Sequence, residues 1–140
     1  MEQTDRRIVD LLRADERMSF TDLGKQLGLS TSAVHQRVRR LEERGVLAGY
    51  AARVDHVALG NALTAFMSIT PLDPAAPDDV PDRLRGIPEI EECHSVAGDM
   101  SYVLKVRVAS PAALEELIAK VRAAANVSTR TTIVLSTPWE

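Results

Sequence analysis

The apolar residues in the first 45 positions recur three and four residues apart, which is the spacing of one face of an amphipathic helix. This pattern predicts three helices, over residues 4–14, 19–27 and 30–45. Side chains suited to capping stand at their starts: Thr4 or Asp5, then Ser19, then Ser30. Gly28 separates the last two helices, since glycine readily adopts the left-handed conformation that ends a helix. The expected inward-facing residues are Ile8, Leu11, Leu12, Leu23, Leu27, Val34, Val38 and Leu41.

From residue 62 onward, apolar and polar positions alternate, which is typical of strands, and two further helical stretches interrupt them. We expect strands over residues 62–70, 89–97, 102–108 and 127–135. We expect helices over residues 78–85 and from the pair Ser110-Pro111, an N-cap followed by proline at the first helical position. The order β-α-β-β-α-β is that of a ferredoxin-like domain, in which two helices cover one face of a four-stranded antiparallel sheet.

Between these regions, residues 46–54 fit a strand or an extended linker, and Asp55 caps a short turn that Gly60 ends. The expected organisation is a helical domain at residues 1–46, a strand-like hinge at 47–60 and a ferredoxin-like domain at 61–140, giving an α+β protein. Two helices leave one face of the sheet uncovered, and we expect that face to expose several aliphatic residues. Because a second copy of the sheet could cover it, the sequence predicts a homodimer.

Two helices joined by a short turn containing glycine are typical of a helix-turn-helix, whose second helix enters the major groove of DNA. From Thr31 to Leu41 this helix carries three arginines and no acid. Gln36 and Arg39 lie opposite the apolar stripe and can make bidentate contacts to base edges. Arg37 lies nearer that stripe and is expected to hold the domain together. Contacts to phosphate or sugar are expected from Lys25, Thr31, Ser32, His35 and Arg40. A basic amphipathic helix without a nucleic-acid partner is the alternative.

The 140-residue chain has a formal net charge of −3, which by itself argues weakly against a nucleic-acid partner. The charge is unevenly divided, because residues 1–50 carry nine basic and eight acidic side chains and residues 51–140 carry eight and twelve. This division fits one domain that contacts DNA and one that does not. No apolar stretch is long enough to span a membrane and no signal region begins the chain, so a cytoplasmic protein is expected.

Catalytic and metal-ligating patterns do not stand out. Cys93 is the only cysteine, which excludes an intrachain disulfide and a thiolate zinc cluster. Cys93 and His94 are neighbours on an expected strand, so their side chains point to opposite faces and cannot chelate one metal. There is no glycine-rich phosphate loop and no Ser/His/Asp spacing. An enzyme built on the ferredoxin-like domain is therefore the weakest hypothesis, and no cofactor is expected.

Six stretches, in this order and spacing, resemble the Lrp/AsnC (feast/famine) family of transcription regulators over nearly the whole chain: residues 5–8, 23–30, 37–50, 92–99, 102–108 and 129–131. The resemblance implies a winged or plain helix-turn-helix, joined by a hinge to a ferredoxin-like domain that dimerises through its sheet. It also implies that dimers often assemble into octamers and that an amino acid commonly binds between dimers.

The resemblance places this effector near the loop that joins the second and third strands: Gly98, Asp99, Met100, Ser101 and Tyr102. Gly98 allows the backbone to approach a ligand closely, Asp99 can pair with an α-ammonium group and the Ser101 hydroxyl can bond the carboxylate. Many family members have a second acidic residue where this chain has Ser101. Thr129 and Thr131 on the last strand are further pocket candidates. The alternative is an ordinary hairpin turn, in which Asp99 caps its own backbone.

Together these features predict a sequence-specific DNA-binding transcriptional regulator whose oligomeric state or DNA binding is modulated by an amino acid. The alternative is an architectural protein that binds double-stranded DNA with little sequence preference and has no small-molecule response. The ratio of specific to non-specific affinity distinguishes the two.

Overall fold

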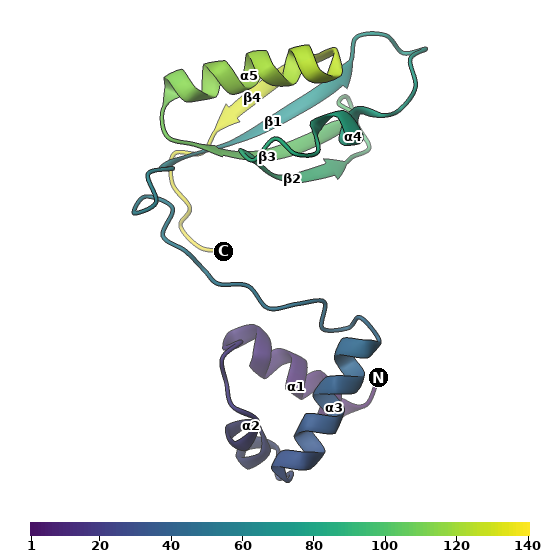
Figure 1. Cartoon of the computed structure of the whole chain (residues 1–140), viewed down its shortest axis with the longest axis vertical. Coiled ribbons are helices and arrows are strands. Elements are labelled where there is room, and N and C mark those ends of the chain that lie inside the picture. Colours follow the sequence, from purple (N-terminus) through teal and green to yellow (C-terminus); the bar gives the residue numbers. More distant parts are fainter. The chain divides into compact units, whose positions relative to one another are not determined.

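The computed structural model describes all 140 residues, and the chain divides into two compact units, Met1–Val54 and Asp55–Glu140. The first unit contains the helices α1 (Gln3–Ala14), α2 (Phe20–Leu27) and α3 (Thr31–Glu43) (Figure 1). The second contains β1 (Leu63–Pro71), α4 (Val80–Leu84), β2 (Ile90–Ser95), β3 (Tyr102–Val108), α5 (Pro111–Ala125) and β4 (Val127–Ile133). None of the helices combines the length and the apolar character needed to cross a membrane.

A small apolar core holds the three helices of the first unit together. Six of the eight residues expected to face inward are buried in it: Ile8, Leu12, Leu23, Val34, Val38 and Leu41. Leu11 and Leu27 pack against this core and stay partly exposed. The helical periodicity identifies this core because a helix turns residues three and four apart toward the same side.

The starts of α2 and α3 are capped as the sequence predicts. Ser19 Oγ accepts a hydrogen bond from the backbone N–H of Asp22 at 3.1 Å, and Ser30 Oγ accepts one from that of Ala33 at 3.2 Å. Gly28 ends α2 in the left-handed region, with a φ of 70°. These side chains and this conformation satisfy backbone groups that a helix end leaves without partners.

The start of α1 differs from the prediction that Thr4 or Asp5 caps it. Glu2 occupies the N-cap position, and its side chain makes no capping hydrogen bond. The Asp5 carboxylate instead accepts a hydrogen bond from Arg37 Nη1 at 2.8 Å, and the Glu2 carboxylate accepts one from the same atom at 2.9 Å. The hydrogen bonds to Asp5 and to Glu2 raise the pKa of Arg37. Arg37 therefore ties α3 to α1, the role that its place beside the apolar stripe predicts.

Residues 46–54, expected to be a strand or an extended linker, form no strand. Of the winged and plain forms of the helix-turn-helix, the first unit is thus the plain one, with three helices. Asp55 caps the next turn as predicted, because its Oδ1 accepts hydrogen bonds from the backbone N–H groups of Val57 at 3.0 Å and Ala58 at 3.2 Å. Gly60 ends this turn with a φ of 82°.

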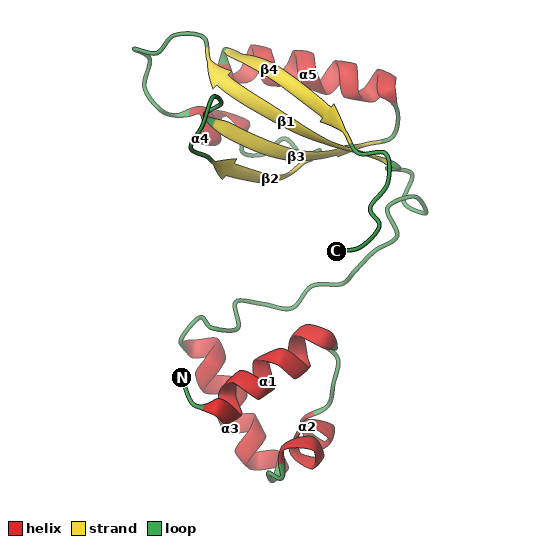
Figure 2. Ribbon diagram, turned by 180° about the vertical axis from the view of Figure 1, so that it is seen from behind, coloured by secondary structure: helices red, strands yellow, loops and turns green.

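The second unit is an antiparallel sheet in the order β2-β3-β1-β4, with α4 and α5 on one face (Figure 2). The two central strands turn every second residue toward these helices: Ala65, Met67 and Ile69 on β1, and Leu104, Val106 and Val108 on β3. They pack against the apolar stripe of α5, which buries Leu114, Leu117 and Val121. This is the ferredoxin-like topology that the sequence predicts.

The uncovered face of this sheet carries fewer apolar side chains than expected. Phe66 is its one large exposed apolar residue, with 41% of its surface accessible, and Val103 is half-buried. The other outward positions of the central strands are polar or charged: Thr64, Ser68, Thr70, Lys105 and Arg107. The prediction of several exposed aliphatic residues is therefore wrong, because strand alternation turns most of them toward the helices.

The close approach of α2 to the turn before α3 depends on Gly24. A Cβ atom added at Gly24 would lie 2.4 Å from the carbonyl oxygen of Leu29. The backbone N–H of Leu29 in turn donates to the carbonyl oxygen of Gly24 at 2.9 Å. Any side chain at this position must push two backbone segments apart.

We therefore expect Gly24→Ala to lower the free energy of unfolding of the first unit by about 3 kcal/mol, measured by urea denaturation followed by circular dichroism. Gly28→Ala is the matched control. Nothing lies within 4 Å of the Cβ added at Gly28, so only its positive φ is unfavourable, at about 1–2 kcal/mol. Equal losses in the two variants would contradict a steric role for Gly24.

Candidate nucleic-acid interface and ligand pocket

The residues predicted to contact DNA all have exposed side chains on α2 and α3: Lys25, Thr31, Ser32, His35, Gln36, Arg39 and Arg40. Those on α3 lie away from the buried stripe, so a partner can reach them. His35 also packs edge-on against Phe20, with the two ring centroids 5.5 Å apart. This contact gives His35 a packing role between α2 and α3 besides the predicted contact to DNA.

Hydroxyl groups surround the start of α3. Thr31 Oγ1 lies 3.4 Å from Thr21 Oγ1, and Ser32 Oγ lies 3.3 Å from Ser30 Oγ. Together with the backbone N–H groups of the first turn, these hydroxyls make a suitable place for a phosphate group. Sequence reasoning did not name Thr21, although its position two residues after the Ser19 cap places it in the first turn of α2.

The two predicted arginines are held along α3 by partners on the same helix. Arg39 Nε donates to Glu43 Oε1 at 3.0 Å, and the two side chains are 72% and 61% exposed. Arg40 Nε donates to the carbonyl oxygen of Gln36 at 3.4 Å. Exposed ion pairs of this kind contribute little to stability, about 0.3–0.5 kcal/mol. The guanidinium of Arg39 is therefore only weakly held by Glu43 and is available to another partner.

In the second unit, the loop between β2 and β3 lines a cavity of about 560 Å³ together with the segment that follows β1. Four of the seven residues predicted to bind an effector line it: Gly98, Met100, Ser101 and Tyr102. The loop is anchored to β1, because the Ser101 N–H donates to the Ile69 carbonyl oxygen at 3.0 Å and Thr70 Oγ1 donates to Met100 Sδ at 3.4 Å. Gly98 has a φ of 141°, a conformation that side chains disfavour.

The other three predicted effector residues lie apart from this cavity. Asp99 is exposed and does not line it. Thr129 and Thr131 are half-buried on β4, which β1 separates from β3. Thr129 Oγ1 accepts a hydrogen bond from Arg122 Nε at 2.9 Å. One chain thus does not bring all seven residues together at this cavity, and an effector role for each of the seven stays a prediction.

Sequence reasoning missed Asp78, which also lines the cavity. The hydroxyl of the buried Tyr102 donates to Asp78 Oδ1 at 2.5 Å. This hydrogen bond, followed by burial and by the charge of the carboxylate, raises the pKa of Tyr102. The only signal in the sequence was the acidic pair Asp78-Asp79, which is equally typical of a helix start.

Cys93 and His94 lie on opposite faces of β2, as strand alternation requires, with Cys93 opposite Leu104 and His94 opposite Val103. His94 Nε2 lies 2.9 Å from Glu92 Oε2, and burial raises the pKa of the Cys93 thiol. No group of three or more histidine, cysteine, aspartate or glutamate side chains is placed to hold a metal ion.

The two units match two domains of one family. Residues 1–42 match the AsnC-type helix-turn-helix domain, and residues 64–140 match the Lrp/AsnC ligand binding domain. The chain therefore belongs to the Lrp/AsnC family of transcriptional regulators. Members of this family are regulators and not enzymes, which agrees with the sequence-based prediction.

Particular relatives extend the match over both units. The HTH-type transcriptional regulator LrpA of Mycobacterium tuberculosis is 55% identical over 137 residues, which cover 98% of this chain and 91% of that protein. The leucine-responsive regulatory protein of Escherichia coli K12 is 36% identical over 140 residues, covering 96% and 85%. A feast or famine regulatory protein of M. tuberculosis complexed with L-methionine has a TM-score of 0.97 at 54% identity, covering 99% and 95%.

We expect Asp78→Asn to lower the pKa of Tyr102 toward its ordinary value, because the substitution removes the carboxylate that favours the protonated phenol. The measurement is the ultraviolet absorbance of tyrosinate during alkaline titration. A Tyr50→Phe background leaves Tyr102 as the only tyrosine. Asp73→Asn is the control, since Asp73 lines the same cavity without bonding Tyr102. An unchanged titration in Asp78→Asn would show that the bond is absent in solution.

Proposed function

We propose that this protein is a sequence-specific DNA-binding transcriptional regulator, and that an amino acid modulates its assembly or its DNA binding. The observation that carries the proposal is the exposed Gln/Arg face of α3, in the same chain as a domain of the Lrp/AsnC ligand-binding type. The cavity beside the β2–β3 loop supports the second part of the proposal.

In the DNA complex, α3 enters the major groove. Gln36 and Arg39 contact base edges, because the amide and the guanidinium can each make two parallel hydrogen bonds there. The remaining exposed residues contact phosphate or sugar and set the register of the helix: Lys25, Thr31, Ser32, His35 and Arg40. The hydroxyls and N–H groups at the start of α3 support this arrangement.

The effector is an amino acid that binds at the β2–β3 loop. Asp99 pairs with its α-ammonium group and the Ser101 hydroxyl bonds its carboxylate, while the cavity takes the side chain. The relative of M. tuberculosis complexed with L-methionine supports this choice of ligand class. The effector lies between dimers, where Asp99, Thr129 and Thr131 can join the site from neighbouring copies.

Assembly couples the two units. The uncovered sheet face, where Phe66 is exposed on the central strand β1 among mostly polar side chains, is the surface through which two copies pair. Dimers assemble further into octamers, as the resemblance to the Lrp/AsnC family implies. A dimer also presents two copies of α3 to successive turns of DNA. An effector shifts the assembly only by its difference in affinity between the two oligomeric states.

On the DNA upstream of its own gene, we expect Arg39→Ala to lose about 1–3 kcal/mol of binding free energy and to relax sequence preference. Arg40→Ala is expected to weaken binding to cognate and scrambled DNA alike and to reduce the dependence on salt. Both are measured by fluorescence anisotropy at several salt concentrations. Arg13→Ala, an exposed residue of α1, is the charge-matched control. Unchanged affinity in both α3 variants would mean that another surface contacts DNA.

We expect a pool of the standard amino acids, at fixed salt, to shift the DNA affinity or the sedimentation of the wild-type protein. Asp99→Asn should weaken the response to the active amino acid about tenfold, because it removes a charge-assisted hydrogen bond. Asp82→Asn, an exposed carboxylate on α4 outside the cavity, is the control. Selective DNA binding without any shift would refute the amino-acid response, and equal binding to scrambled DNA would favour the architectural alternative.

A further inference from the structure

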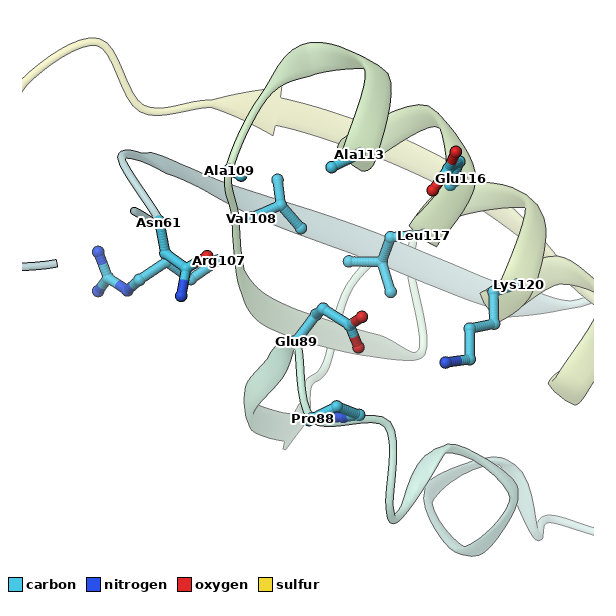
Figure 3. A pocket seen from close by; sticks show the side chains of 10 residues that line it. All are labelled: Asn61, Pro88, Glu89, Arg107, Val108, Ala109, Ala113, Glu116, Leu117 and Lys120. Atoms are coloured by element: carbon cyan, nitrogen blue, oxygen red, sulfur yellow. The ribbon is translucent and has the colours of Figure 1, made fainter. Parts of the chain in front are cut away.

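A second cavity, of about 510 Å³, lies at the opposite end of β3 from the β2–β3 loop (Figure 3). β3 begins at Tyr102, beside the first cavity, and ends at Val108, which lines the second. The two positions are six residue steps apart along the strand, or about 20 Å. The two cavities share no lining residue, so the second is a separate place on the ligand-binding domain.

Glu89 gives this cavity its chemical character. Its Oε2 atom is buried and has no hydrogen-bond partner. The residue is held in place, because the Glu89 carbonyl oxygen accepts a hydrogen bond from the Arg107 N–H at 2.9 Å. Figure 3 shows the carboxylate directed into the space below α5. A buried carboxylate oxygen without a donor is unfavourable, so this position calls for a hydrogen-bond donor.

The cations around the cavity do not supply that donor. Arg107 Nε donates to Glu91 Oε1 at 2.6 Å and its Nη1 donates to Thr64 Oγ1 at 2.7 Å, so its guanidinium is already engaged. The hydrogen bond to Arg107 also lowers the pKa of Glu91, which keeps that pair charged. Lys120 is exposed on α5 and its amine points toward Glu89 in Figure 3, but it forms no hydrogen bond with it.

We propose that this cavity binds a small molecule through a primary ammonium group, which donates to Glu89. An ammonium group carries three donors and a positive charge, which are what the buried carboxylate oxygen lacks. The aliphatic part of the molecule lies against Val108, Ala113 and Leu117. If the molecule is an amino acid, its carboxylate faces the Lys120 ammonium group. A simple amine has no carboxylate and therefore makes no contact of this kind with Lys120. This proposal does not depend on the amino-acid site at the β2–β3 loop.

The test is isothermal titration calorimetry of the full-length protein with n-butylammonium, L-norvaline and butanoate at fixed pH and salt. We expect n-butylammonium to bind saturably and butanoate not to bind. Glu89→Gln should weaken n-butylammonium binding at least tenfold. Glu115→Gln, a neighbouring carboxylate that is exposed on α5 and does not line the cavity, should leave it unchanged. Circular dichroism of both variants establishes that they are folded.

Two results would overturn the proposal. The first is that n-butylammonium does not bind to the wild-type protein, or that Glu89→Gln does not weaken its binding. The other is binding only in Lys120→Met, which would mean that Lys120 itself neutralises Glu89 in solution. L-Norvaline distinguishes the two classes of ligand, amino acids and simple amines. If Glu89→Gln and Lys120→Met both weaken its binding, the site takes amino acids; if Glu89→Gln weakens only n-butylammonium, the site takes simple amines.

Discussion

The close contact between Gly24 and the backbone of Leu29 sets the geometry on which the DNA-facing part of the chain depends. Because no side chain intervenes, α2 and the turn before α3 approach to backbone hydrogen-bond distance. The buried stripe of α3 packs into the core, so the polar side of the helix faces outward. Arg37 ties the helix to α1 through its ion pairs with Asp5 and Glu2. The outward position of Gln36 and Arg39 follows from this packing, because the only side-chain partner of Arg39 on α3 is the exposed and weakly bound Glu43.

The second unit follows a different constraint, the alternation of its central strands. β1 and β3 turn nearly all of their aliphatic side chains toward α4 and α5, which leaves a mostly polar outer face. The two cavities lie at the two ends of β3, where strands give way to loops. Each of these two cavities combines residues of a loop with the end of a strand, where loops can present polar groups without disturbing the core.

Most of the fold could be predicted from local patterns. The periodicity of apolar residues predicted the buried stripes of the helices, and the capping residues Ser19 and Ser30 predicted where two helices begin. The alternation of apolar and polar residues predicted the strands and, with the helices, the β-α-β-β-α-β order. The cap of α1 could not be predicted, because the Asp5 carboxylate accepts a hydrogen bond from Arg37, which lies 32 residues away along the chain. The candidate site, likewise, could be predicted only where it depends on residues close together in the chain. The exposed face of α3 follows from its own period, whereas the bond from Tyr102 to Asp78 joins residues 24 apart.

Short-range periodicity and capping involve residues close together in the chain, so the elements and the outward face of α3 could be predicted from the amino acids alone. The family followed from the order and spacing of six sequence stretches. The packed structure alone shows which polar groups meet across elements. It paired Asp78 with Tyr102, separated Thr129 and Thr131 from the loop cavity, and left Glu89 Oε2 buried without a donor. The physical reason is that burial and hydrogen bonding between distant residues depend on how the sheet and helices pack, which no local pattern records.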